Sequence, residues 1–376
     1  MYFYGQIPHM HYSRMPIEIE SPEELGYQNI KINLAESSVA EKSIGQLGLD
    51  LNQIKLEYTS HRGHHGLRHL IAREGEGLEP DDVLLTGGAA MALYMVHTCL
   101  LNKNDQVVVL HPNYSSNIAA PQAIGCAIDP LILEFKNNWD LDLDALHRQI
   151  KPSTRLLSLT YPHNPTGKIL TDEMIVQLIR LVEQYDLYCL IDETYRDACF
   201  ETTYPLLAGA HPRMISVLSF SKGYGLPGIR IGALVSTDTV LMNQFLAAKE
   251  MIQICNPPLE EAIAFHIYQQ KSSYLKPINL AARANLEILK SWLSRETRVE
   301  AVLPGGGVVC YARINKELDY SRFHRVLMDD FGTLTGPGHW FGMSDQYFRI
   351  GFAYPTAAQL EKGLTNISQA LDLLES

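Results

Sequence analysis

Short apolar runs alternate with helical patterns between about residues 80 and 235, and this alternation constrains the fold more than any other feature. The runs are QVVVLH (106–111), AIDPLIL (127–133), RLLSLTY (155–161), LYCLIDE (187–193), MISVLSF (214–220) and RIGALVS (230–236). Strands that are apolar along their whole length are typical of sheets buried on both faces. Helical patterns at 89–101, 143–150 and 172–185 separate several of the runs. The sequence therefore predicts an α/β fold with a mostly parallel sheet between layers of helices.

The pattern changes after residue 236. Helices are expected at 239–250 and 259–292, strands at 299–304, 307–314 and 347–352, and further helices at 320–331 and from 356 onward. This is the pattern of a smaller α+β unit. The apolar run IKINLA (30–35) is expected to pack with that unit. We predict an N-terminal arm that is part of the small domain (1–45), a large domain (46–255) and a C-terminal small domain (256–376).

Composition excludes several classes of function. The formal net charge of −11 disfavours nucleic-acid binding, which needs a basic surface. No apolar stretch is long enough to span a bilayer, and the first residues lack the pattern of a signal peptide. The histidines and cysteines show no metal-ligand spacing, so no metal is expected. A cytoplasmic protein without membrane contact is the expectation.

The stretch SFSKGYGLPGIRIG (219–232) contains the spacing G-x-G-x-x-G. A dinucleotide-binding loop should open a helix, but here a second strand pattern follows, so that interpretation is rejected. Lys222 instead lies just past a buried strand, where partial desolvation favours a Schiff-base nucleophile. Ser219 supplies a hydroxyl and Arg230 supplies the planar fork of donors that suits a phosphate.

This stretch resembles the lysine motif of class I/II aminotransferases, the fold type I enzymes that use pyridoxal 5'-phosphate. The resemblance runs from about Tyr58 to the C-terminus. It implies that Lys222 holds the cofactor and that Asp192, in LIDETYRD, pairs with the protonated ring nitrogen. It also implies that Tyr195 and Asn164, the latter in YPHNPTGK, contact the phenolic oxygen of the ring, and that Asn164 also contacts the substrate.

Other positions match the same family. Gly88, Ala89 and Ala90 open a helix whose N–H groups suit a phosphate. The resemblance implies that Tyr114 stacks on the ring and that Arg349, in FRIGF, grips the α-carboxylate of the substrate. Many relatives carry a polar side chain where this chain has Ala90, so only backbone can serve there. Tyr58 belongs to a segment, with Gly63, Leu67 and Arg68, that usually reaches the phosphate of a partner subunit, which implies a homodimer.

The N-terminal region indicates a substrate. Glu18, Glu20 and Glu36 cluster in the segment that lies near the distal end of the substrate in this fold, and carboxylates suit a guanidinium. The region resembles the dioxygen-using arginine oxidases and hydroxylases and the related capreomycidine synthases. The expectation is therefore oxidation of L-arginine with dioxygen as co-substrate. An aminotransferase, or a cyclase like capreomycidine synthase, is the alternative, and these glutamates could equally be solvated.

Overall fold

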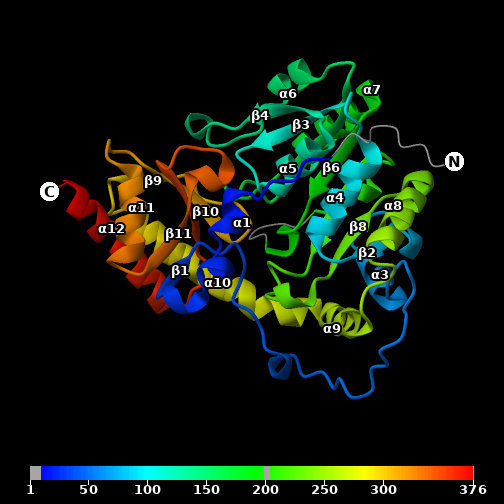
Figure 1. The fold of residues 1–376 in the computed structure, drawn as a ribbon, viewed down its shortest axis with the longest axis horizontal. Coiled ribbons are helices and arrows are strands. Elements are labelled where there is room, and N and C mark those ends of the chain that lie inside the picture. The colour runs from blue at the N-terminus through cyan, green and yellow to red at the C-terminus, as the bar shows by residue number, and fades with distance from the viewer. Residues whose placement is uncertain (1–9, 199–203, 376) are drawn as a thin grey trace.

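The computed structural model describes residues 10–198 and 204–375. Figure 1 shows two sheets at opposite ends of the long axis of the molecule, with helix α1 (Pro16–Ile19) between them. The larger sheet comes from the middle of the chain, and the smaller sheet combines the N-terminal segment with the C-terminal part. The site described below lies where the N-terminal segment passes between the two.

The larger sheet has seven strands in the order β2-β8-β7-β6-β5-β3-β4. Strand β8 runs antiparallel to both neighbours, and the other pairs are parallel. The strands are β2 (Val83–Thr86), β3 (Gln106–His111), β4 (Ala127–Ile132), β5 (Thr154–Thr160), β6 (Tyr188–Asp192), β7 (Met214–Ser219) and β8 (Gly232–Val235). This confirms the predicted α/β class with a mostly parallel sheet.

Helices cover both faces of this sheet, as the near-continuous apolar strands require. Apolar side chains of α4 (Ala89–Leu100) and α8 (Thr239–Ile252) pack on one face. Those of α6 (Leu143–Gln149) and α7 (Asp172–Tyr185) pack on the other face. Helices α3 (His65–Ala72) and α5 (Ser116–Ile124) complete the layers. All six predicted runs contain strands of this sheet. Sequence analysis missed β2, because four residues are too few to show a clear periodic pattern.

The smaller sheet has the order β1-β11-β12-β10-β9. Its strands are β1 (Ile32–Leu34), β9 (Val299–Ala301), β10 (Val309–Ile314), β11 (Thr333–Pro337) and β12 (Tyr347–Gly351). Helices α10 (Lys271–Leu293), α11 (Tyr320–Asp329) and α12 (Ala357–Glu375) share its core. Strand β1 pairs in parallel with β11, so the run IKINLA joins this unit. Sequence analysis missed β11, because TLTGP reads as a loop with glycine and proline.

The predicted helix over 259–292 is wrong as a single element. It is two helices, α9 (Pro258–Gln269) and α10, and Gln270 between them has φ −114° and ψ 24°. Helix α9 packs with α3 under the larger sheet, whereas the end of α10 packs under the smaller sheet. Because of this break, residues 258–293 contribute side chains to the cores next to both sheets. The domain boundaries at 45 and 255 stay a prediction.

The remaining short elements include α2 (Pro22–Leu25) and the 3₁₀ turn η8 (Gly338–Phe341). No helix in the described part of the chain is both long and apolar enough to cross a membrane.

Candidate active site

The carboxyl ends of β5, β6 and β7 meet at one edge of the larger sheet. Their last residues are Thr160, Asp192 and Ser219. Ligands of open α/β sheets bind at this edge. A cavity of about 290 Å³ opens there. Its walls are formed by Glu23, Ser37, Ala89, Ala90, Leu93, Tyr114, Thr160, Asn164, Asp192, Thr194, Tyr195, Ser219, Ser221, Lys222, Pro227 and Arg230.

Lys222 lies three residues beyond the end of β7 and lines this cavity. Its side chain is half-buried, and its Nζ forms no hydrogen bond or ion pair with the residues that the structure describes. The backbone is fixed, because the carbonyl of Lys222 accepts a hydrogen bond from Val39 N–H at 3.0 Å. A held lysine with a free amine is the arrangement that a covalent nucleophile needs.

Asp192 is a buried carboxylate without a cation. It is 4% exposed, and no ion pair to it exists among the described residues. Its Oδ1 accepts hydrogen bonds from Thr194 N–H at 3.1 Å and from Thr194 Oγ1 at 2.6 Å. Burial raises the pKa of Asp192, and the bonds from Thr194 offset part of the rise. A protonated ring nitrogen in the cavity would supply the missing positive charge.

Two side chains on the cavity wall could contact an oxygen of a bound ring. Asn164 Nδ2 lies 3.4 Å from Tyr195 Oη, and both residues are buried. Tyr114 also lines the cavity, and its backbone N–H donates to Asn113 Oδ1 at 2.7 Å. Burial and the nearby Glu18 raise the pKa of Tyr114, so its ring stays neutral.

The opposite end of the cavity suits an anion. Helix α4 begins at Ala89, and Ala90 follows, so the first backbone N–H groups of a twelve-residue helix face the cavity wall. Arg230 Nη1 donates to Ser221 Oγ at 3.2 Å and has no carboxylate partner among the described residues. Gly88 has φ +87°, and a Cβ there would lie 2.6 Å from Arg230 Nη2. Glycine at this position leaves room for the guanidinium.

Arg349 in β12 is a buried cation that lacks a carboxylate. It is 3% exposed and forms no ion pair with the described residues. Nη1 donates to Asn164 Oδ1 at 3.0 Å, and Nη2 donates to the carbonyl of Ala35 at 2.5 Å. Burial lowers the pKa of Arg349, and charge on Tyr195 and Glu36 offsets part of this effect. An anionic ligand group next to Asn164 would complete its pairing.

The structure separates the three N-terminal glutamates. Glu18 Oε1 accepts a hydrogen bond from Tyr114 Oη at 2.9 Å. Glu20 lies away from the cavity, on the side chains of η8. Glu36 follows β1 and lies near both Lys222 and Arg349, whose charges lower its pKa. Burial outweighs them and raises the pKa of Glu36.

Sequence analysis missed several residues of the site. Glu23 lines the cavity and also raises the pKa of Glu36, so it is a second carboxylate near Glu36. Thr194 was not singled out, although it stands between Asp192 and Tyr195 in one motif. Ser221 had the same signal, since it is the residue before Lys222. Glu23 had none, because nothing local distinguishes it from Glu24, and both are exposed.

The segment expected to reach a partner subunit does not enter this cavity. Tyr58 is 82% exposed. Arg68 is buried within the chain, where it donates to the carbonyls of Gly63 and Pro80 and pairs with Asp81 at 3.1 Å. Arg68 therefore braces the base of the segment, and Leu67 is fully buried beside it.

These residues fit pyridoxal 5'-phosphate. The cavity has a free amine for the aldehyde, an orphaned buried carboxylate for the ring nitrogen, and two side chains for the phenolic oxygen. A helix N-terminus and an unpaired guanidinium meet at the other end for the phosphate. Lys222, Asp192, Tyr195 and Arg230 would hold these parts of the cofactor.

Comparisons with known proteins agree with this fit. Residues 33–367 match the family described as aminotransferase class I and II. The chain is 30% identical to capreomycidine synthase of Streptomyces vinaceus over 361 residues, which is 92% of this chain and 91% of that protein. It is 27% identical to an arginine–pyruvate transaminase of Pseudomonas aeruginosa over 308 residues, 78% of this chain and 77% of that protein.

Solved structures give the same result. A PLP-dependent aminotransferase from Streptococcus suis superposes with a TM-score of 0.89 at 25% identity, covering 95% of this chain and 98% of that one. The fold is therefore fold type I, and the cofactor is pyridoxal 5'-phosphate. The chain belongs to the class I and II aminotransferase family.

Proposed function

We propose that this enzyme acts on the Cα amine of L-arginine or a close analogue. The observation that carries the proposal is a buried cation that lies near carboxylates but forms no ion pair with any of the described residues. Arg349 forms no ion pair with the described residues, but Glu36 lies near enough for each charge to shift the pKa of the other group, and Glu23 lies near Glu36. An α-carboxylate at Arg349 and a guanidinium at these glutamates would satisfy both ends.

Asn33 explains why Glu36 is positioned there. Its Oδ1 accepts hydrogen bonds from the N–H groups of Ala35 at 3.0 Å and Glu36 at 3.2 Å. This turn directs the chain away from the sheet directly after β1. The same turn presents the carbonyl of Ala35 to Arg349. One short segment thus contacts the carboxylate-binding arginine and supplies a carboxylate for the distal end. Glu18 stays a secondary candidate, since the Tyr114 hydroxyl already donates to it, whereas Glu20 lies away from the cavity on the side chains of η8.

Different residues of the chain would carry out different parts of the reaction. When bound, the pyridoxal ring withdraws electrons from Cα of the substrate. Lys222 Nζ would bind the aldehyde of the cofactor in the resting enzyme and, once the substrate amine displaces it, accept the Cα proton. Asp192 would hold a proton on the ring nitrogen. Asn164 would orient both the ring oxygen and Arg349, because it contacts Tyr195 and Arg349 at once.

We favour amine transfer to a 2-oxo acid, because one relative is an arginine–pyruvate transaminase and its name gives both reactants. A cyclisation is the second candidate, because the 30% identical relative is a capreomycidine synthase and aligns over nearly the whole chain. Oxidation by dioxygen rests on the resemblance of the N-terminal region. It stays a prediction, since the curated relatives named above are a synthase and a transaminase.

Incubation with L-arginine in air, with and without pyruvate, separates these outcomes. Transamination predicts alanine formed in proportion to arginine consumed, and only with pyruvate present. Oxidation predicts oxygen uptake and ammonia without pyruvate. Cyclisation predicts that arginine with a hydroxyl on Cβ, supplied in place of arginine, loses water and gives a product that keeps both the Cα amine and the guanidino nitrogens. Failure of arginine and of its hydroxylated analogues to react under any condition would contradict the proposed substrate class.

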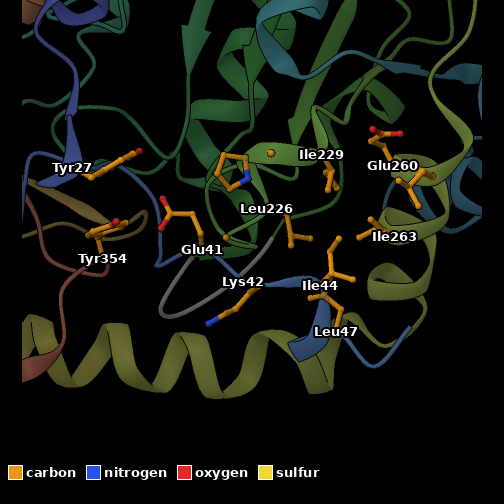
Figure 2. Close-up of a pocket in the computed structure, with 14 residues that line it drawn as sticks. Tyr27, Glu41, Lys42, Ile44, Leu47, Leu226, Ile229, Glu260, Ile263 and Tyr354 are labelled. Atoms are coloured by element: carbon orange, nitrogen blue, oxygen red, sulfur yellow. The ribbon is translucent and has the colours of Figure 1, made fainter. Parts of the chain in front are cut away.

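We also propose a homodimer in which a second copy contributes Tyr58. Leu56 and Tyr58 are 84% and 82% exposed on the extended segment that projects from the molecule near residues 48–60 (Figure 1). A groove of about 660 Å³ lies beside the cofactor cavity, and Pro227 lines both. Figure 2 shows Leu226, Ile229 and other apolar side chains converging on it. The exposed segment of the second copy is the occupant that we propose.

The mass in solution tests this assembly. A dimer predicts about twice 42.3 kDa by light scattering. Replacing Tyr58 by phenylalanine should weaken cofactor retention without changing the mass, because only the hydroxyl would reach the phosphate of the partner. A monomer that retains full activity on dilution would contradict the proposal.

A further inference from the structure

Arg349 lies close to two aromatic side chains of η8. The guanidinium Cζ lies 6.0 Å from the ring centroid of Trp340 and 5.0 Å from that of Phe341. Gly336 lies between the indole and the arginine, because a Cβ there would be 3.2 Å from Trp340 Cε3 and 3.3 Å from Arg349 Cβ. Trp340 and Phe341 are 3% and 2% exposed. The position of Arg349 therefore depends on where this aromatic wall is fixed.

Glu20 fixes the wall. Its Oε2 accepts a hydrogen bond from Trp340 Nε1 at 2.7 Å and lies 2.8 Å from His339 Nε2. The indole N–H is a donor only, and a buried donor needs an acceptor. His339 Nδ1 lies 2.7 Å from Asp345 Oδ1, so the imidazole bridges two carboxylates. Burial disfavours the charged imidazole, but the bonds to Glu20 and Asp345 outweigh it and raise the pKa of His339.

The same short segment also reaches the other side of the site. Ile17 of α1 is buried in one cluster with Trp340 and Phe341. Glu18, two residues before Glu20, accepts the hydrogen bond from the hydroxyl of Tyr114, which lies in the loop between β3 and α5. Segment 17–20 therefore connects the ring-stacking tyrosine to the wall behind Arg349.

We propose that Glu20 and His339 are positioning residues for the substrate carboxylate. Glu20 holds the Trp340 indole against Arg349, and His339 holds Glu20. The inference rests on the proposed function, in which Arg349 binds the α-carboxylate. It predicts that loss of Glu20 raises KM for the amino acid and leaves kcat nearly unchanged, since no reacting atom touches Glu20.

KM should depend on the protonation state of His339 and should be lower when His339 is charged. With the imidazole charged, both nitrogens donate, one to Glu20 and one to Asp345. As pH rises through the raised pKa of His339, one nitrogen loses its proton and faces a carboxylate without a donor. His324 and Arg325 of α11, and Asp329, face the same groove, so their charges also bear on His339. KM should therefore rise with pH in the wild-type enzyme.

The test uses the holoenzyme with L-arginine as substrate. Glu20→Ala should raise KM about tenfold, because a buried N–H loses a charged acceptor. Glu20→Gln should recover most of the affinity, because its amide oxygen can accept from Trp340. The pH dependence of KM should nonetheless flatten, because no carboxylate remains to pair with His339. Glu24→Gln is the matched control: Glu24 is half-exposed, its one ion pair with the described residues is to Arg14 at 3.3 Å, and the change should leave KM unchanged.

A double variant distinguishes loss of the positioning contact from a folding defect. Trp340→Phe removes the indole donor, so adding Glu20→Ala to it should change KM by less than twofold. An additive effect of the two changes, or a Glu20→Ala enzyme with wild-type KM, would overturn the inference. Arg349→Lys is measured in parallel. If it leaves KM unchanged, the proposed carboxylate site fails and this inference fails with it. If it raises KM and Glu20→Ala does not, only the positioning role fails.

Discussion

The two ends of the site are built differently. The end that would receive the cofactor is formed by strand ends of one sheet and the start of a helix, and Asp192, Ser219 and Lys222 lie on adjacent or consecutive pieces of it. The end that would receive the substrate is assembled from the N-terminal segment and strand β12, more than 300 residues apart in sequence. The first is held by backbone, and the second by side-chain contacts such as those of Glu20 and Arg349. Changes at the first should stop chemistry, and changes at the second should retune affinity and selectivity.

The largest effect is expected at Lys222. Replacing it with alanine removes both the covalent anchor and the base, so kcat should fall by about 10⁴-fold or more. Borohydride reduction followed by intact mass measurement should show no cofactor joined to the chain. A lysine-linked cofactor in that variant would refute the assignment.

Asp192→Asn comes next. The amide still accepts the hydrogen bonds from Thr194, but it cannot hold a proton on the ring nitrogen, so kcat should fall by about 10²- to 10³-fold. Thermal unfolding of the cofactor-free protein should show a fold at least as stable as wild type, because without the cofactor the buried charge of Asp192 has no positive partner among the described residues and the variant lacks that charge. Activity within a few-fold of wild type would show that the carboxylate has no such role.

A smaller effect is expected at Gly88. An alanine there must adopt φ +87° and would displace the Arg230 guanidinium, so cofactor affinity should weaken about tenfold. Equilibrium dialysis of the cofactor measures this change. Gly228→Ala is the control, because a Cβ at Gly228 meets nothing within 4 Å. Equal losses in both variants would argue against a specific role for the guanidinium.

The smallest effect is expected far from the site. Thr171 Oγ1 accepts the hydrogen bond from Met174 N–H at 3.2 Å and caps α7. Thr171→Ala should lower the free energy of unfolding by about 1 kcal/mol and leave kcat and KM unchanged. Chemical denaturation and steady-state rates together check this. A changed KM would mean that the two regions are more tightly coupled than the contacts indicate.

The same contrast explains what the sequence could predict. Lys222, Asp192 and Asn164 follow buried strands, so their place at one edge of the sheet follows from local pattern and parallel topology. Helix α7 likewise spans Asp172–Tyr185, as the pattern over 172–185 predicts. Glu23 could not be found, because its role depends on a turn that brings residues 23 and 36 together. The contact between Glu20 and Trp340 joins residues 320 positions apart and leaves no periodic signal.

The separation of Glu18, Glu20 and Glu36 has the same origin. Their spacing predicts a shared neighbourhood, but side-chain direction divides them. Glu18 faces the larger sheet and Glu20 faces η8, while Glu36 lies beyond β1 near Lys222. Which carboxylate faces a cavity is decided by three-dimensional packing.

The central claim is that the substrate end selects a cationic side chain. It is tested most directly by comparing kcat/KM for L-arginine and L-citrulline, which differ in charge but hardly in shape, in wild type and in Glu36→Gln. The account predicts that wild type prefers arginine by about tenfold or more, and that the preference shrinks in the variant because one carboxylate is lost. Because burial raises the pKa of Glu36, the wild-type preference should also grow as pH rises through that pKa. Equal use of citrulline and arginine by the wild-type enzyme at neutral pH would contradict the account.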